Sequence, residues 1–241
     1  MAPTSTSRGL LEEGTRTITE RNHRELSTIE GNLITASGGK DVNTLLVTSC
    51  TPRDGKTTAA VGIAVTMAKM PHTRVLLLDG NLHNPRLHEL FSLSREDGFS
   101  DYILSGGSME GILSGGSMEG ADVGGTIRET DYPNLFLMTA GRRVDNSLEV
   151  FRDPNFASRF QWLTGHFTHL VFDAPFYLGP SDASLVARLF DGILLVIACE
   201  RTKRPVIQLV KERIAGAGGH LLGVILNRRQ YYIPPWAYRF I

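Results

Sequence analysis

Short runs of consecutive apolar residues recur along the chain, separated by polar or glycine-rich turns. Apolar side chains at successive positions are typical of strands in a parallel sheet that is covered on both faces. The first run begins at Leu45, directly before a turn. The other predicted strands span residues 74–79, 134–139, 169–173, 192–198 and 221–226.

Helical patterns alternate with these strands. We expect helices directly after Gly55, near Asn155–Leu163, over Ser181–Phe190 with Ser181 or Asp182 as its cap, and over Val206–Ala215. Strands that alternate with helices indicate an α/β fold with a doubly wound, mostly parallel sheet and right-handed crossovers. Ligands of such sheets bind beyond the carboxyl ends of the strands.

The chain divides into three predicted parts. Residues 1–40 form an N-terminal arm and a helix over Ile18–Ile34, residues 41–227 form the α/β domain, and residues 228–241 form a tail with three tyrosines. Within the domain, the segment Ile103–Gly111 recurs unchanged as residues 112–120. We interpret this duplicated loop (103–120) as a tandem duplication that lengthens a surface loop, because loops tolerate insertions well. A glycine- and serine-rich phosphate loop is the alternative.

Composition narrows the class of protein. Lys plus Arg and Asp plus Glu each total 25 in 241 residues, and this balance argues against nucleic acid as the main partner. The two cysteines, Cys50 and Cys199, lack metal-ligand spacing, which indicates a reducing, cytoplasmic setting. The polar first 40 residues lack the apolar core of a signal peptide, and the longest apolar run, Ile193–Cys199, is too short to cross a bilayer.

The turn after the first strand carries the chemistry of a phosphate-binding loop. A helix N-terminus offers unpaired backbone N–H groups and partial positive charge to a polyphosphate. Lys56 can reach the terminal phosphates of ATP, and the Thr57 hydroxyl can bind Mg²⁺. The strict pattern has a glycine where this chain has Cys50, and an ordinary turn is the alternative. The predicted nucleotide-binding residues are Pro52, Arg53, Asp54, Gly55, Lys56, Thr57 and Thr58.

Two acidic residues end predicted strands at the same edge of the sheet. Asp79 and Asp173 each follow an apolar run, so their carboxylates can face the nucleotide cleft. Mg²⁺ typically takes one or two carboxylates together with phosphate oxygens and water. We therefore expect Thr57, Asp79 and Asp173 to hold Mg²⁺; helix capping or a buried salt bridge is the alternative for each acid.

The order of these motifs resembles that of the bacterial protein-tyrosine kinases (BY-kinases) of capsule and exopolysaccharide synthesis, in the form of their stand-alone cytoplasmic kinase domain. The similarity spans roughly residues 22–241. The segments that carry it are Thr48–Thr58, Val75–His88, Gly98–Tyr102, Pro133–Leu135, Ala140–Gly141, His169–Pro175, Asp191–Val196, Leu222–Arg228 and the tail tyrosines.

The resemblance implies a P-loop NTPase fold of the MinD/ParA-like, deviant Walker type. It places Lys56 and Thr57 in the Walker A motif and assigns catalytic roles to Lys56, Asp79 and Asp173. It also implies that Asn227 contacts adenine and that a neighbouring subunit phosphorylates the tail. The implied phosphoacceptors are Tyr231, Tyr232 and Tyr238. The implied partners are further copies of the chain and a membrane protein, a polysaccharide co-polymerase that governs chain length, through which the protein reaches the membrane.

Three positions depart from the family pattern. Asn81 replaces a second acid, and His83 replaces an arginine. The segment Arg21–Arg24, followed by Ser27, differs from the motif that makes subunit contacts in the family. A neutral amide at position 81 cannot act as a base of useful strength, so we expect slow phosphoryl transfer.

Three functions follow from these features. The first is an ATP- and Mg²⁺-dependent tyrosine autokinase that modifies its own tail and so regulates polysaccharide synthesis. The second is a catalytically weak nucleotide-binding switch that acts on the membrane partner. The third is a MinD/ParA-type ATPase, which generally has an additional lysine early in the loop, where this chain has only residues 49–54 without lysine.

Overall fold

The computed structural model describes residues 41–105, 125–179 and 182–228. The predicted arm and helix of residues 1–40, residues 106–120 of the duplicated loop and the tail from residue 229 lie outside the described residues. The three tail tyrosines are among them, so the predictions for these segments, and for the three-part division, stay predictions.

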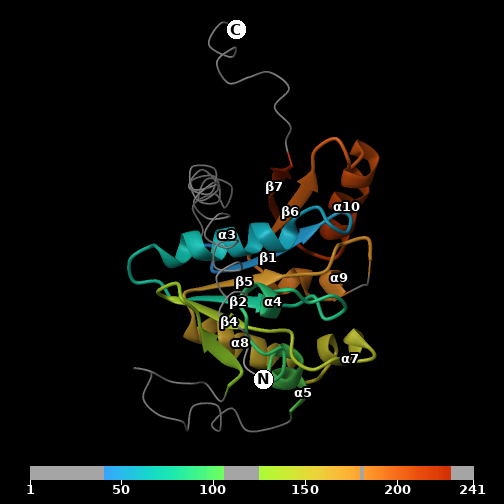
Figure 1. Cartoon of the computed structure of the whole chain (residues 1–241). Coiled ribbons are helices and arrows are strands. Elements are labelled where there is room, and N and C mark those ends of the chain that lie inside the picture. Colours follow the sequence, from blue (N-terminus) through green and yellow to red (C-terminus); the bar gives the residue numbers. More distant parts are fainter. Residues whose placement is uncertain (1–40, 106–124, 180–181, 229–241) are drawn as a thin grey trace, which may run out of the picture.

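The described chain alternates strands with helices, as the apolar pattern predicts (Figure 1). Its strands are β1 (Thr44–Ser49), β2 (Val75–Asp79), β3 (Ile127–Glu129), β4 (Leu135–Met138), β5 (His169–Asp173), β6 (Gly192–Ala198) and β7 (Leu221–Asn227). Its helices are α3 (Lys56–Ala68), α4 (Leu87–Leu90), α5 (Phe99–Leu104), α7 (Ser147–Phe151), α8 (Phe156–His166), α9 (Asp182–Val186) and α10 (Arg204–Gly216). A single 3-10 turn at Ala187–Leu189 follows α9.

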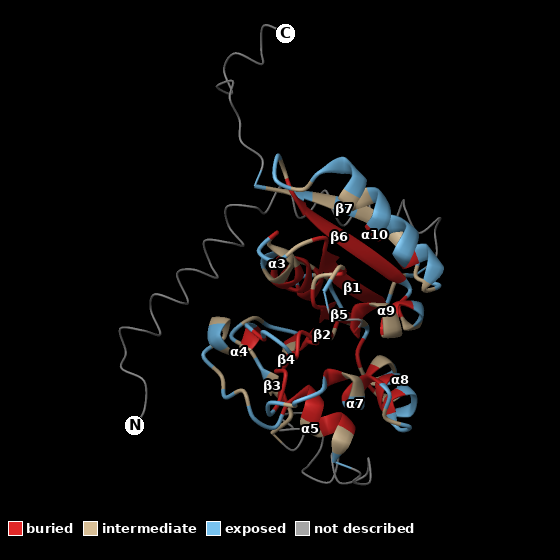
Figure 2. Cartoon of the chain, turned by 90° about the vertical axis from the view of Figure 1, so that its right-hand side faces the viewer, coloured by how far each residue is buried: buried red, intermediate tan, exposed pale blue. Residues whose placement is uncertain are grey.

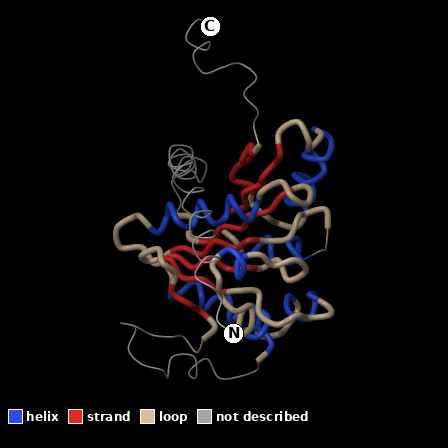
Figure 3. The backbone as a smooth tube through the Cα atoms, viewed as in Figure 1, coloured by secondary structure: helices blue, strands red, loops and turns tan. Residues whose placement is uncertain are grey.

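The strands form one sheet of seven in the order β3-β4-β2-β5-β1-β6-β7, with the helices around it (Figure 3). All neighbours are parallel except β3 and β4, which pair antiparallel. This topology confirms the predicted doubly wound, mostly parallel sheet. From β1 the chain builds toward β2 and β4 on one side and toward β6 and β7 on the other, so the carboxyl end of β1 lies at the point where ligands bind in such sheets.

Two apolar layers enclose the sheet. On one face, Leu45 and Val47 of β1 pack with Val61 and other residues of α3. On the opposite face, residues such as Leu46 and Phe172 pack with helices α5, α7, α8, α9 and α10. Figure 2 shows the central strands as buried, whereas most of α10 is exposed. The strands are therefore covered on both sides, which explains their continuous apolar runs.

The structure differs from the predicted elements mainly in short segments. Strand β3 and helices α4, α5 and α7 have three to six residues each, too few to show a period in the sequence. The helix predicted over 181–190 ends at Val186 and continues as the 3-10 turn. Among the described residues, no helix is both long and apolar enough to cross a membrane.

Candidate active site

The turn between β1 and α3 is held by its own side chains. Asp54 is buried, and its carboxylate accepts hydrogen bonds from the backbone N–H of Thr51 at 2.9 Å and from the Thr51 hydroxyl. Gly55 has a φ of +97°, in the left-handed region that favours glycine. No side chain caps α3, so the N–H groups of its first turn stay available to an anion. The turn thus has the conformation expected of a phosphate loop, and no side chain occupies the N-terminus of α3 as a cap.

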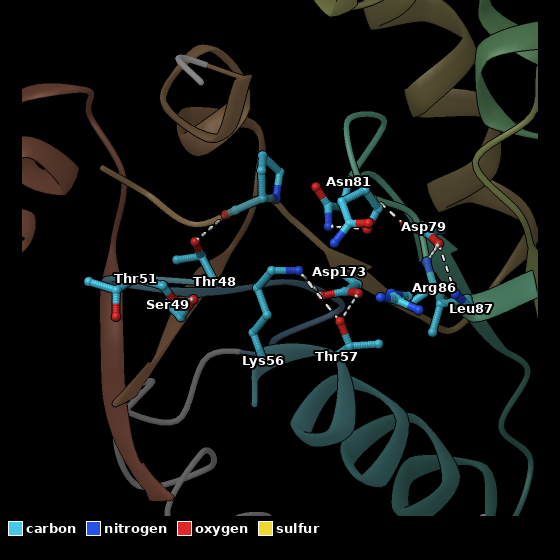
Figure 4. A network of polar contacts seen from close by, with 12 residues as sticks. Thr48, Ser49, Thr51, Lys56, Thr57, Asp79, Asn81, Arg86, Leu87 and Asp173 are labelled. Carbon is cyan, nitrogen blue, oxygen red and sulfur yellow. Dashed lines mark hydrogen bonds and ion pairs between the residues drawn. The ribbon is translucent and has the colours of Figure 1, made fainter. Parts of the chain in front are cut away.

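Lys56, Thr57 and Asp173 meet directly in front of this helix end (Figure 4). The Lys56 ammonium lies 3.1 Å from one carboxylate oxygen of Asp173, and the Thr57 hydroxyl donates to the other oxygen at 2.7 Å. Asp173 is fully buried, whereas the Lys56 side chain is 11% exposed. The three predicted site residues therefore form one charged, hydrogen-bonded group on the open end of α3.

Asp79 lies beside Asp173 on the neighbouring strand, since the two residues are paired in the register of β2 and β5. Its carboxylate accepts from the backbone N–H groups of Arg86 and Leu87, at 2.9 and 3.0 Å. Asp79 therefore caps the start of α4, which is the alternative that the sequence left open for this residue. Burial, and then the negative charge of Asp173, raise the pKa of Asp79 from 3.8 to about 7.

The oxygen atoms of this group suit magnesium. Thr57, Asp79 and Asp173 offer hydroxyl and carboxylate oxygens at one edge of the sheet, and Mg²⁺ prefers such hard ligands. Among the described residues, no three His, Cys, Asp or Glu side chains gather closely enough to hold a metal ion by themselves. A magnesium ion here would need phosphate oxygens as well, as in sites where the metal arrives with a nucleotide.

Asn227, at the end of β7, contacts the phosphate loop. Its side-chain amide donates to the backbone oxygen of Asp54 at 2.9 Å. A Cβ atom on Gly55 would lie only 1.9 Å from the same amide nitrogen. Asn227 thus braces the loop in this structure, and a contact with adenine stays a prediction.

The other predicted nucleotide contacts fall into two groups, exposed residues and one buried residue. Pro52, Arg53 and Thr58 are exposed at the rim of the loop, where a ligand can reach them. Asp54, in contrast, is committed to the loop itself by its bonds to Thr51. Asp54 therefore shapes the phosphate loop, and a direct contact with the nucleotide stays a prediction.

Cys50 occupies the position of the first glycine in the strict loop pattern. Its side chain is fully buried in the core, and burial raises the pKa of the thiol to about 11. The residue therefore packs beneath the loop and does not act as a nucleophile.

The two departures after Asp79 have defined contacts. The Asn81 amide donates to the backbone oxygen of Asn84 at 2.7 Å, and the Asn81 backbone N–H donates to Asp79 at 3.2 Å. The His83 ring lies 2.9 Å from the carboxylate of Asp182. Asp182, predicted as a helix cap, is the first residue of α9, and its side chain binds across to His83. No local pattern could reveal this contact, because the two residues lie far apart in the chain.

No protein-family model matches the chain. Among curated proteins, the tyrosine-protein kinase YwqD of Bacillus subtilis is 27% identical over 209 residues, which are 87% of this chain and 82% of that protein. Among solved structures, the chimerical protein CapA2B2 superposes with a TM-score of 0.75 and 25% identity, covering 86% of this chain and 85% of that one.

The septum site-determining protein MinD of Pyrococcus horikoshii, solved with Mg-ADP, superposes with a TM-score of 0.60. It is 20% identical and covers 82% of this chain and 76% of that one, so it shows a shared fold alone. This likeness confirms the predicted P-loop fold of the MinD/ParA-like type. The resemblance read from the motifs is confirmed as well: the chain is similar to bacterial proteins named as tyrosine-protein kinases.

Proposed function

We propose that the chain is an ATP- and magnesium-dependent tyrosine autokinase whose substrate is its own tail. The observation that carries the proposal is the contact of Lys56 and Thr57 with Asp173 at the uncapped N-terminus of α3. This arrangement provides a cation, a hydroxyl and a carboxylate where a terminal phosphate would lie. The relatives named as tyrosine-protein kinases support a kinase over other users of ATP.

Binding follows from the groups around the loop. The N–H groups at the start of α3 would hold the phosphates, and Lys56 would offset their negative charge. Thr57, Asp79 and Asp173 would hold the magnesium ion, which when bound neutralises charge on the transferring phosphate. Lys56 must leave Asp173 at least partly to reach the phosphates, because its ammonium lies 3.1 Å from that carboxylate.

Transfer would depend on positioning more than on a strong base. A loose transition state for phosphoryl transfer needs the tyrosine oxygen placed in line and the charge stabilised. The Asn81 amide cannot accept the tyrosine proton, and its nitrogen is already bonded to the Asn84 carbonyl. We therefore expect slow autophosphorylation, with Lys56, Asp79 and Asp173 essential.

The described tyrosines support the tail as the acceptor. Tyr102 and Tyr177 are buried, and their hydroxyls donate to backbone oxygens at 3.1 and 3.4 Å. Burial raises the pKa of Tyr102 to about 12, so its hydroxyl is a poor nucleophile. Tyr132 is partly exposed, but it lies between β3 and β4, away from the strand ends that form the site. The acceptors of the proposal are Tyr231, Tyr232 and Tyr238.

The proposal extends to partners and location, and here it rests on the family resemblance. A second copy of the chain would present its tail to the cleft. A membrane polysaccharide co-polymerase would activate the kinase at the inner face of the membrane, and tail phosphorylation would regulate the length of a capsular or exopolysaccharide chain. The similarity to the solved chimerical protein CapA2B2 supports this part of the proposal.

A specific observation favours a second candidate function. Position 81 has an amide and not a carboxylate beside Asp79, so the site lacks a base for phosphoryl transfer. The groups that would bind the nucleotide are still present. The chain would then act as a nucleotide-dependent switch on the same membrane partner. A MinD/ParA-type ATPase is a third candidate, supported by fold alone.

The test is incubation of the purified chain with labelled ATP and Mg²⁺, followed by mass spectrometry of the tail. The kinase proposal predicts label on tail tyrosines, loss of label in Lys56→Met, and loss of nearly all label when Tyr231, Tyr232 and Tyr238 are changed together to Phe. Tyr132→Phe is the matched control and should keep the label.

Each alternative gives a different result in the same assay. ATP binding that raises the melting temperature without any label would support the switch and refute the kinase. Release of inorganic phosphate without label on the protein would support the ATPase. Label that persists after the triple change to Phe would show that the tail is not the substrate.

A further inference from the structure

A second polar cavity lies at the same edge of the sheet as the candidate active site. Its volume is about 250 Å³, and it is formed by the loops that follow β2 and β4 and by the loop before α5. Its first lining residue directly follows Asn81, whose backbone N–H donates to Asp79. Its lining residues are Leu82, His83, Arg95, Arg143, Val144 and Asp145. None of them belongs to the predicted nucleotide site.

The His83 ring in this cavity is held in a fixed orientation. Ser147 donates its hydroxyl proton to Asp182 at 2.9 Å, and its oxygen lies 3.0 Å from His83 Nε2. Asp182 lies 2.9 Å from the same nitrogen. Because the serine proton is already used and the carboxylate only accepts, Nε2 must carry the proton. Ser147 and Asp182 are both buried, so the ring is anchored from below and exposed at its other side.

Two guanidinium groups complete the cavity. Arg95 uses its Nε–H to bind the backbone oxygen of Gly141 at 2.8 Å, which fixes the side chain and leaves its terminal nitrogens for a ligand. Arg143 is exposed and makes no hydrogen bond or ion pair with any described residue. Asp145 is the one acid in the lining, so positive charge is in excess.

Two other arginines of the loops that follow β2 and β4 differ from these two. Arg86 is paired with Glu89 at 2.6 Å, and Arg142 is paired with Asp101 at 3.1 Å. Their charges are neutralised, whereas the charge of Arg143 is not. The lining thus combines the unpaired charge of Arg143 with two apolar side chains, Leu82 and Val144.

We propose that this cavity is a docking subsite for an aryl phosphate, namely a phosphotyrosine in the polypeptide substrate. Guanidinium groups bind phosphate oxygens with paired, charge-assisted hydrogen bonds. Leu82 and Val144 offer apolar contact to the ring of the phosphotyrosine, and the volume accommodates the ring together with its phosphate.

The proposal deepens the proposed function and rests on it for the identity of the substrate. The tail contains no Asp or Glu, so its side chains become anionic only when a tyrosine has been phosphorylated. A phosphotyrosine held in the cavity would place another tail tyrosine closer to the nucleotide. The first phosphorylation would therefore favour the next.

The test measures binding without catalysis. The full chain, treated with phosphatase, is titrated into a fluorescent peptide of residues 229–241 that carries phosphotyrosine at position 232, and anisotropy is recorded without ATP. We expect this peptide to bind at least about tenfold more tightly than the unphosphorylated peptide, as removal of a charge-assisted contact costs about a factor of ten. Arg143→Ala should abolish most of this preference.

The controls separate this site from general attraction of charge. Arg188→Ala removes an exposed arginine that precedes β6, at the opposite edge of the sheet, and should leave the preference unchanged. Equal binding of the two peptides, or an equal loss in Arg188→Ala, would overturn the proposal. A peptide with Glu at position 232 that binds as tightly as the phosphopeptide would overturn the choice of an aryl phosphate.

Failure of the proposed function would look different. Because the binding assay uses no ATP, a chain that binds the phosphopeptide but never labels itself would refute the autokinase and leave the cavity as a phosphotyrosine site. Arg95→Lys serves as a second variant: it retains the charge but loses the paired hydrogen bonds, and it should weaken binding of the phosphopeptide while the melting temperature stays near that of the wild type.

Discussion

Asp79 should make the stability of the protein depend on pH in an unusual direction. In the folded protein its pKa is raised from 3.8 to about 7, first by burial and then by Asp173. Between these two values the unfolded chain has released a proton that the folded protein still holds. The free energy of unfolding therefore falls as pH rises from about 4 to about 7, and the loss levels off above that range.

The size of the effect follows from the same shift. One pKa unit corresponds to about 1.4 kcal/mol, so the whole shift corresponds to about 4 kcal/mol. Between pH 5.5 and pH 7.5 this one group should lower the free energy of unfolding by about 2 kcal/mol. His88 and His169 act in the opposite direction, because burial lowers the pKa of both.

The perturbation is Asp79→Asn, which keeps an oxygen that can accept from the backbone N–H of Arg86 or Leu87 but cannot ionise. The assay is urea denaturation of both proteins at each pH, without nucleotide or magnesium. Subtracting the two profiles removes the histidine contribution, which both proteins share. We expect the wild type to lose about 2 kcal/mol relative to the variant over this range.

Asp145→Asn is the control, since Asp145 is an exposed acid near the same cleft. Its profile should run parallel to that of the wild type. If the profiles of Asp79→Asn and the wild type were parallel too, the buried carboxyl would not hold its proton and the reasoning would be refuted. Addition of Mg²⁺ and ATP should reduce the difference, because a cation near Asp79 favours the ionised form.

Three further substitutions test the site. Asn81→Asp, alone or with His83→Arg, should accelerate label incorporation at saturating ATP and Mg²⁺, yet lower the free energy of unfolding by about 1–3 kcal/mol because the donor to Asn84 is lost; slower labelling would refute the view of a degenerate site. Asn227→Ala should weaken ATP binding and cost about 1 kcal/mol in denaturant unfolding, since its bond to the loop disappears. Gly55→Ala should abolish the rise in melting temperature that ATP causes, because the new Cβ would overlap the Asn227 amide; an unchanged rise would show that the loop does not bind the nucleotide.

The sequence alone predicted the strands of the sheet well, because a strand buried on both faces leaves a continuous apolar run. It also placed Lys56, Thr57 and Asp173 at one edge, since carboxyl ends of parallel strands meet there. The direction of the Asp79 side chain could not be read in the same way. It depends on α4, whose four residues are too few to show a helical period.

Contacts between residues that lie far apart in the chain could not be predicted from the sequence either. His83 lies in the loop after β2, whereas Ser147 and Asp182 begin α7 and α9. The three meet only because the sheet brings these segments to one edge. The brace between Asn227 and Asp54 has the same origin, since β1 and β7 flank β6 and the last strand ends beside the first turn. Other roles were predicted for Asp54, Asp182 and Asn227, and their partners could not be inferred from their positions in the chain.

The position of β1 in the middle of the sheet has a consequence for how the protein reaches its folded state. Thr44 pairs with Leu170 on one side, and Leu45 pairs with Gly192 on the other, so both partners come from the later half of the chain. During synthesis the apolar first strand therefore leaves the ribosome long before either neighbour exists. Pairing over such separations in sequence is slow, and an apolar strand that waits unpaired is prone to associate with other chains. A fragment that stops before Leu170 should aggregate and fail to form the phosphate loop, even though it contains every residue of that loop.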